Sequence, residues 1–198
     1  MNKIDLKKII KFAKPLYRKT GKYHTWEHIL RVRKHALRIA KKYKAIKLPI
    51  LEASVYLHDI GRSMKNGDHV KNSILLSRKF LEREKIDKED IGTICHAIES
   101  HDIKNILKAK TREAKILFDA DKLEIASVNG FMRMCTWLVE ERNFELHNAV
   151  NFLWDNIQKA IKGNYLRTRE ANKILKKEIP VLKKFVDLYN KWEKQFSK

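Results

Sequence analysis

The sequence is poor in residues that interrupt helices and in residues that cross-link chains. Its 198 residues include only 6 glycines, 3 prolines and 2 cysteines. Cys95 and Cys135 form no CxxC pair, which argues against a disulfide framework or a cysteine zinc site and favours buried free thiols. No run of about 18 uncharged apolar residues occurs, and the stretch 1–14 has lysines where a signal peptide has an apolar segment. A cytoplasmic protein without a membrane span is therefore expected.

Positive charge is abundant and unevenly distributed. The chain has 44 lysines and arginines against 24 acidic residues, a formal net charge of +20. Residues 1–50 carry a net charge of +14 and residues 158–198 a net charge of +8, whereas residues 51–157 carry −2. Such a field attracts anionic ligands, including nucleotides, polyphosphates and nucleic acid, although a lysine-rich solvated surface explains the charge equally well.

Apolar residues recur at helical spacing along nearly the whole chain, and no long strict alternation indicates a sheet. The expected fold class is therefore all-α, with Pro180 kinking or restarting the last helix. Asp68, Asp87 and Thr111 are expected to cap the fourth, fifth and sixth helices, and Val128 to lie inward on the sixth. The other expected helices span roughly 3–18, 25–44, 49–58, 129–141, 143–162 and 168–196.

The chain contains no repeat, linker or low-complexity segment. We expect a single helical domain over residues 1–160, which includes the N-terminal helix and carries the functional site. Residues 161–198 are expected to form a basic helical extension packed on the same domain.

Three short segments place histidine or aspartate on apolar helix faces or at their ends. His28 lies at the margin of the buried face of the expected second helix. His58 and Asp59 end an apolar helix, where adjacent side chains can turn toward one ion. Asp121 lies on a core-facing stripe, where a carboxylate is costly unless it is paired or binds a metal. Two imidazoles and two carboxylates suit Mn, Fe, Co, Ni, Zn or Mg, with positions left for water and substrate.

The order of these residues resembles the H…HD…D signature of the HD-domain superfamily of metal-dependent phosphohydrolases, which are all-helical. The resemblance covers about residues 20–135 and implies that His28, His58, Asp59 and Asp121 hold a divalent metal ion, one per chain. The matching segments are His28-x-x-Arg31-Val32, His58-Asp59-Ile60-Gly61 and Asp119-Ala120-Asp121-Lys122-Leu123.

Further histidines extend the resemblance. His69 and His101 resemble the additional histidines with which some HD enzymes bind a second metal or phosphate. Because Asp102 follows His101 where dinuclear relatives often have a second histidine, phosphate contacts are favoured, with a helix-cap or core role as the alternative. Residues 23–28 resemble the YHNxxH segment of cyclic-nucleotide phosphodiesterases, with Thr25 in place of asparagine, which implies that His24 protonates the leaving oxygen.

Basic residues near the signature complete the expected site. Arg31 and Lys122 match positions where the family pattern commonly has a basic residue, and Arg62 lies one turn or less from the expected ligands. All three could neutralise phosphate oxygens or remain solvated. The expected substrate-binding residues are Arg31, Arg62, His69, His101 and Lys122.

These features predict an enzyme that hydrolyses a phosphoester or phosphoanhydride of a nucleotide or similar small substrate. A metal-activated water is the expected nucleophile, and Asp59 and His24 are the expected catalytic residues. The alternative is an HD-type nuclease or phosphodiesterase that acts on RNA or DNA through the basic surface. Two further functions are considered. One is a nucleic-acid-binding module with a vestigial site, and the other is a di-iron oxygenase, which requires a second metal. The sequence leaves the oligomeric state open.

Overall fold

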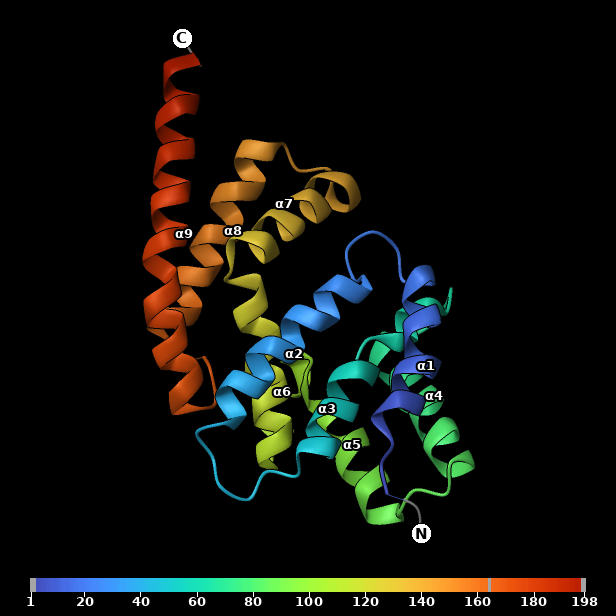
Figure 1. Cartoon of the computed structure of the whole chain (residues 1–198). Helices are drawn as coiled ribbons and strands as arrows, with labels where there is room; N and C mark the ends of the chain where they lie inside the picture. The colour runs from blue at the N-terminus through green and yellow to red at the C-terminus, as the bar shows by residue number, and fades with distance from the viewer. Residues whose placement is uncertain (1–2, 164, 197–198) are drawn as a thin grey trace. The chain divides into compact units, whose positions relative to one another are not determined.

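A computed structural model describes residues 3–163 and 165–196. Over this part of the chain the structure consists of helices and contains no strand, so the all-α prediction is confirmed (Figure 1). The α-helices are α1 (Leu6–Leu16), α2 (Trp26–Ala40), α3 (Leu48–Leu57), α4 (His69–Arg83), α5 (Lys88–Ser100), α6 (Arg112–Ile125), α7 (Val128–Arg142), α8 (Leu146–Lys162) and α9 (Arg169–Phe196). Short 3₁₀ helices are η1 (Tyr17–Lys19), η2 (Ile60–Ser63) and η3 (Ile103–Lys108). Among these helices, none has the length and apolar character needed to span a bilayer.

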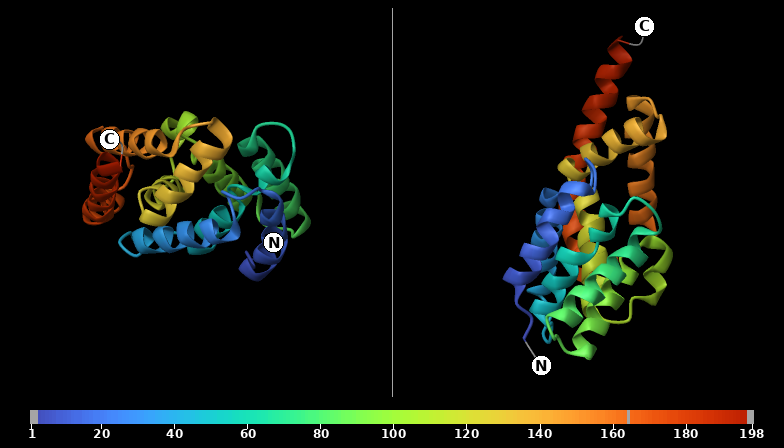
Figure 2. Two further views of the ribbon diagram at one scale, coloured as in Figure 1. Left: turned by 90° about the horizontal axis from the view of Figure 1, so that it is seen from above. Right: turned by 90° about the vertical axis from the view of Figure 1, so that its right-hand side faces the viewer.

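The helices form two compact units, residues 1–121 and residues 122–198. The last helix, α9, packs with α7 and α8 in the second unit (Figure 2). Compactness does not by itself establish an independent domain. The boundary expected at residue 160 therefore stays a prediction.

The first unit is built around α3, whose residues are mostly apolar and are buried along most of the helix. All residues from Ile50 to Leu57 are buried, and α3 packs against α1, α2 and α5. A helix that is hydrophobic all round is stable only inside a core. Its C-terminal end consequently lies in the interior, and the two residues that follow, His58 and Asp59, are buried as well.

Three expected helix caps are present in the first unit. The Asp68 carboxylate accepts hydrogen bonds from the backbone of Val70 and Lys71 at 2.8 and 3.0 Å and so starts α4. Asp87 caps α5. The Thr111 hydroxyl accepts from the backbone N–H of the third residue beyond it and caps α6. Each cap satisfies N–H groups that have no partner within the helix.

The second unit buries an apolar core between α7, α8 and α9. One expectation about this region is wrong: the sixth helix ends at Ile125, and Val128 is 37% exposed because Ser127 caps a new helix with its hydroxyl oxygen. Of the two alternatives expected at Pro180, a restart of the helix is not found. The helix α9 continues through Pro180, because Leu182 on its C-terminal side packs into the same core as the rest of the unit, and a kink there stays a prediction.

Both cysteines are buried free thiols, as expected. Burial raises the pKa of Cys95 and raises the pKa of Cys135 to about 11. Since the thiolate is the reactive form, both side chains should react slowly with iodoacetamide in the native protein at pH 8. Mass spectrometry should show fast labelling of both only after denaturation. Rapid native labelling of Cys135 would contradict its burial.

Candidate metal centre

Asp59 is the centre of a group of histidines brought together from four parts of the first unit. The Asp59 carboxylate is nearly inaccessible, and each of its oxygens faces two imidazoles. Its Oδ2 lies 3.7 Å from His58 Nε2 and 3.9 Å from His24 Nε2. Its Oδ1 lies 3.7 Å from His101 Nε2 and 3.8 Å from His69 Nε2. These separations exceed a hydrogen bond and suit ligands that share an ion at about 2.0–2.2 Å from each.

One cluster of ligand atoms combines three of the residues expected to hold the metal. The ligand atoms of His28, His58 and Asp59 all lie within 4.8 Å of one another, and the three side chains are buried. Asp121, from α6, adds a second carboxylate to this cluster, since its Oδ1 lies 3.5 Å from His28 Nε2. The structure thus brings together the four residues of the H…HD…D pattern.

A second cluster shares Asp59 with the first. It comprises Asp59, His69 and His101, whose ligand atoms also lie within 4.8 Å of one another. His69 comes from the first turn of α4, and His101 follows the last residue of α5. Both residues lie at the centre, and their assignment to phosphate stays a prediction.

Backbone carbonyls fix the tautomers of two of these histidines. His58 Nδ1 lies 2.8 Å from the carbonyl oxygen of Val55, and His101 Nδ1 lies 2.6 Å from that of Ile98. A carbonyl can only accept, so each Nδ1 carries the proton and donates it. In the neutral imidazole Nε2 then bears the lone pair, and in both histidines this atom lies 3.7 Å from Asp59, which is the orientation of a metal-ligating imidazole.

The buried His58 Nε2 atom has no hydrogen-bond partner among the residues described. An unpaired buried polar atom costs free energy unless it has a further partner. Burial also lowers the pKa of His58 to about 4, so its imidazole is neutral at physiological pH. A neutral, unprotonated nitrogen aimed at a carboxylate fits a divalent cation, and the donor set of this centre therefore fits the expected metal.

Arg62 gives the centre a fixed positive charge. Its Nε donates a hydrogen bond of 2.9 Å to Asp59 Oδ1. Burial alone raises the pKa of Asp59, but the Arg62 guanidinium and the surrounding histidines outweigh it and hold that pKa well below its usual range. Burial and the Arg62 charge lower the pKa of His69. Asp59 is accordingly ionised, and the lowered pKa values of His58 and His69 favour their neutral imidazoles.

A close approach at Gly61 positions the second cluster. A Cβ atom there would lie 2.2 Å from the carbonyl oxygen of His69 and 2.3 Å from the backbone nitrogen of Ser73. The Gly61 N–H also donates to the Ser73 hydroxyl at 2.9 Å. The absence of a side chain lets η2 contact the start of α4 and places His69 beside Asp59.

Sequence reasoning missed the role of Tyr17. Its hydroxyl donates a hydrogen bond of 3.0 Å to the carbonyl oxygen of Tyr56, near the end of α3. Burial and the charge of Asp59 raise the pKa of Tyr17 well above its usual range, so it remains a neutral donor. Tyr17 thus satisfies a helix-end carbonyl two residues before His58. In the sequence, Tyr17 stands four residues after Ala13, on the apolar face of the first helix. This spacing indicates a buried residue but does not indicate a role at the metal centre.

Three further residues, His24, Arg31 and Lys122, were expected to take part in the site. His24, whose side chain is 20% exposed, lies at the rim, with its ring 5.8 Å from that of His28. Arg31 is half-buried on α2, and Lys122 is half-buried directly after Asp121. Their assignment as substrate contacts stays a prediction.

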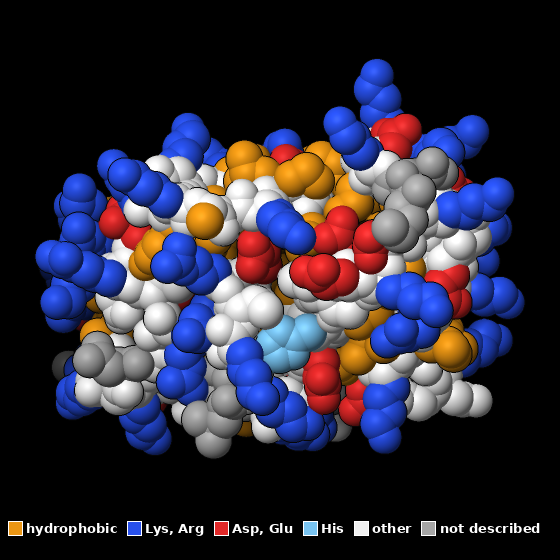
Figure 3. Space-filling view, turned by 90° about the horizontal axis from the view of Figure 1, so that it is seen from below, with side chains coloured by type: hydrophobic (Ala, Val, Ile, Leu, Met, Phe, Trp, Pro, Cys, Tyr) orange, Lys and Arg blue, Asp and Glu red, His pale blue; other side chains and the backbone are white. Residues whose placement is uncertain are grey.

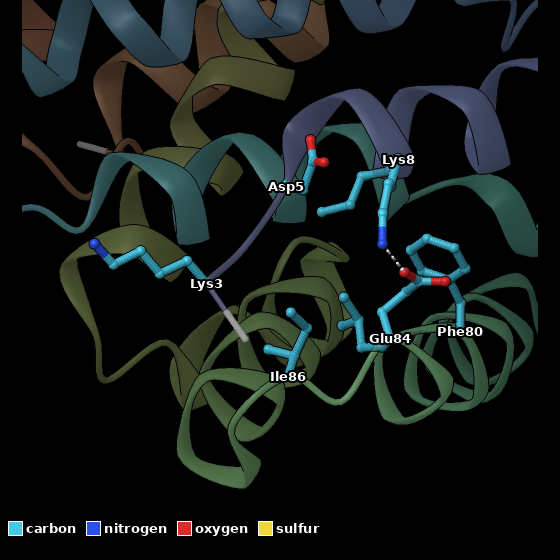
Figure 4. Close-up of a pocket in the computed structure, with 8 residues that line it drawn as sticks. Lys3, Asp5, Lys8, Phe80, Glu84 and Ile86 are labelled. Carbon is cyan, nitrogen blue, oxygen red and sulfur yellow. Dashed lines mark hydrogen bonds and ion pairs between the residues drawn. The ribbon is translucent and has the colours of Figure 1, made fainter. Parts of the chain in front are cut away.

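A separate cavity of about 330 Å³ in the first unit lacks a metal-binding set. It lies between the start of α1 and the end of α4, where Lys8 pairs with Glu84 at 2.8 Å (Figure 4). Its polar lining consists of lysines and carboxylates, without histidine. The chemistry therefore points to the Asp59 centre and not to this cavity.

Comparisons with known proteins agree with the geometry. The sequence model of the HD domain matches residues 25–126. None of the curated proteins matches the chain significantly. A structure from Listeria innocua has a TM-score of 0.73 and 24% identity, covering 96% of this chain and 98% of its own.

Two further solved structures share the fold. One from Lactobacillus plantarum has a TM-score of 0.74 and 18% identity, covering 98% of this chain and 99% of its own. One from an uncultured Thermotogales bacterium, described as a predicted HD superfamily hydrolase, has a TM-score of 0.70 and 19% identity and covers 94% and 92%. At these identities the likeness concerns the fold alone.

Proposed function

The chain belongs to the HD-domain family, and we propose that it is a metal-dependent phosphohydrolase acting on a nucleotide or similar small phosphorylated substrate. The observation that carries this proposal is the convergence of two histidine clusters on the buried carboxylate of Asp59. Such a centre offers metal ligands on one side and groups that bind phosphate oxygens on the other.

His28, His58, Asp59 and Asp121 would hold the divalent cation. When bound, that cation supplies Lewis acidity and lowers the pKa of a coordinated water toward about 7. Within the chain, Asp59 and Asp121 provide the negative charge that binds it. The carbonyl oxygen of Val55 keeps the His58 imidazole in the ligating tautomer.

The partly exposed residues at the rim would handle the substrate. His24, Arg62 and His69 have side-chain exposures of 20%, 30% and 24%, so a phosphate can reach them without unfolding the centre. Arg62 and His69 would bind phosphoryl oxygens and stabilise the charge that develops on them. His24 Nε2 would donate a proton to the leaving oxygen. Arg31 and Lys122 would add further positive charge for the substrate.

The direct test is phosphate or pyrophosphate release from nucleoside mono-, di-, tri- and cyclic phosphates. Metal-stripped protein would be assayed with Mn²⁺, Co²⁺, Ni²⁺ or Mg²⁺ added back. Turnover of one class that requires the metal would support the proposal and identify the scissile bond. Absence of turnover across the panel, with metal binding demonstrated, would argue against a nucleotide substrate.

An HD-type nuclease or phosphodiesterase acting on RNA or DNA is the second candidate, and the basic ends of the chain favour it. On the face shown in Figure 3, however, lysine and arginine side chains are scattered among acidic and apolar ones without forming one continuous strip. If nucleic acid is the substrate, oligonucleotide binding should weaken steeply as salt rises. No binding at low salt would exclude this candidate.

Metal binding should also stabilise the folded protein. A ligand that binds only the native state at about 100 times its Kd adds about 2.7 kcal/mol of stability. We therefore expect Mn²⁺ to raise the Tm of metal-stripped protein in differential scanning calorimetry, and excess EDTA to reverse the shift. An unchanged Tm at millimolar Mn²⁺ would contradict a preformed site.

A further inference from the structure

The two oxygens of the Asp59 carboxylate lie in different surroundings. Oδ2 faces His24 and His58, whereas Oδ1 faces His69 and His101. Oδ1 also accepts a hydrogen bond of 2.9 Å from the Nε of Arg62. A carboxylate that joins two histidine clusters could bridge two cations, so the occupant of the Oδ1 side determines how many ions the centre holds.

We propose that Arg62 takes the place of a second metal ion at Asp59 Oδ1, so that the centre holds a single divalent ion. This inference rests on the proposed metal-dependent function. The single ion would be held by His28, His58, Asp59 and Asp121. On the other side, the Arg62 guanidinium is a built-in cation that cannot dissociate or lose its proton.

Local geometry directs Arg62 onto Asp59. Arg62 is the third residue after Asp59, and the 3₁₀ helix η2 begins immediately after Asp59. Side chains three residues apart are eclipsed in a 3₁₀ helix, whereas in an α-helix they are offset by about 60° around the axis. The backbone N–H of Arg62 bonds to the carbonyl oxygen of Asp59 at 3.1 Å, and the close approach at Gly61 holds this turn against α4.

The two clusters differ in the negative charge that they offer to a cation. The first cluster contains the carboxylate of Asp121 in addition to its share of Asp59, which together match a divalent cation. The second cluster has only its share of Asp59 and the imidazoles of His69 and His101, and so it lacks a second carboxylate. A divalent ion there would lie against the Arg62 guanidinium, and like charges repel strongly at such short range in a buried site.

The same arrangement suits Arg62 for phosphate. Its Nε–H is used by Asp59, and its two terminal nitrogens carry four more donors. The side chain is 30% exposed, so these donors can reach a substrate. Arg62 would thereby connect the metal-binding carboxylate to a phosphoryl oxygen in the position that a second metal ion would otherwise occupy.

The test is the number of Mn²⁺ ions bound per chain, measured by isothermal titration and by metal analysis after desalting. We expect one ion for the wild-type protein and two for Arg62→Gln, which keeps a hydrogen-bond donor and removes the charge. Arg62→Lys retains the charge and should hold one ion. Lys65→Gln removes a charge from an exposed residue of the following loop and should also hold one ion.

Electron paramagnetic resonance gives a second readout that does not depend on turnover. Arg62→Gln loaded with Mn²⁺ should show the exchange-coupled signal of two neighbouring ions, and the wild-type protein should show isolated Mn²⁺. Two ions in the wild-type protein, or one ion in Arg62→Gln, would overturn this inference and leave the metal-dependent function intact. No ion in the wild-type protein would overturn both. Inactivity towards nucleotides, with the expected change from one ion to two, would count against the substrate alone.

Discussion

Replacing Asp59 with asparagine is expected to lower metal affinity and turnover by at least about a hundredfold while the helices remain folded. Loss of an outer partner of a metal ligand already costs about 10- to 100-fold, and Asp59 contributes to both histidine clusters. Arg62 is 30% exposed, so its charge remains hydrated after the change. Because the buried Asp59 carboxylate has a pKa well below its usual range, loss of its charge should also lower the free energy of unfolding of the metal-free protein.

Urea unfolding, Mn²⁺ titration and the nucleotide panel together check this expectation. Asp155→Asn is the matched control, because it removes the same charge from an exposed position on α8 and should leave metal binding and turnover unchanged. Retained turnover in Asp59→Asn, at wild-type metal affinity, would show that Asp59 is not a ligand.

Replacing Gly61 with alanine is expected to destabilise the protein by about 3 kcal/mol or more, at the upper end of the cost of overpacking. The added Cβ would meet the backbone of His69 and Ser73 at 2.2 and 2.3 Å, and backbone cannot move aside as a flexible side chain can. The start of α4 must then shift, which moves His69 away from Asp59. For a chain of this size the Tm should fall by about 6–12 °C.

For Gly92→Ala we expect the opposite change in stability. Gly92 lies on an exposed face of α5, and a Cβ there would meet no atom within 4 Å. Alanine in a helix interior is favoured over glycine by about 0.5–1 kcal/mol, so this variant should be slightly more stable than wild type. Scanning calorimetry of the two variants separates the effect of crowding from that of backbone entropy. Equal Tm values for Gly61→Ala and wild type would contradict the close approach of η2 and α4.

Much of the fold follows from interactions between near neighbours in sequence. Helical spacing of apolar residues located the helices, and the acids at Asp68 and Asp87 marked where two of them begin. Sequence order likewise identified His28, His58, Asp59 and Asp121 as a set. At Pro180 the local tendency of proline to interrupt a helix is opposed by packing. The core contacts of Leu182 keep α9 continuous through this residue.

The sequence by itself thus determined the all-helical class, the order of the candidate ligands and the high positive charge. It could not determine which atoms face which oxygen of Asp59. His101 lies 42 residues beyond Asp59 and reaches it only because α5 packs against the buried helix α3. His69 reaches it only because a glycine lets two backbone segments approach closely. The tertiary structure decided both, because contacts between distant segments depend on the packing of whole helices, which residue spacing does not record.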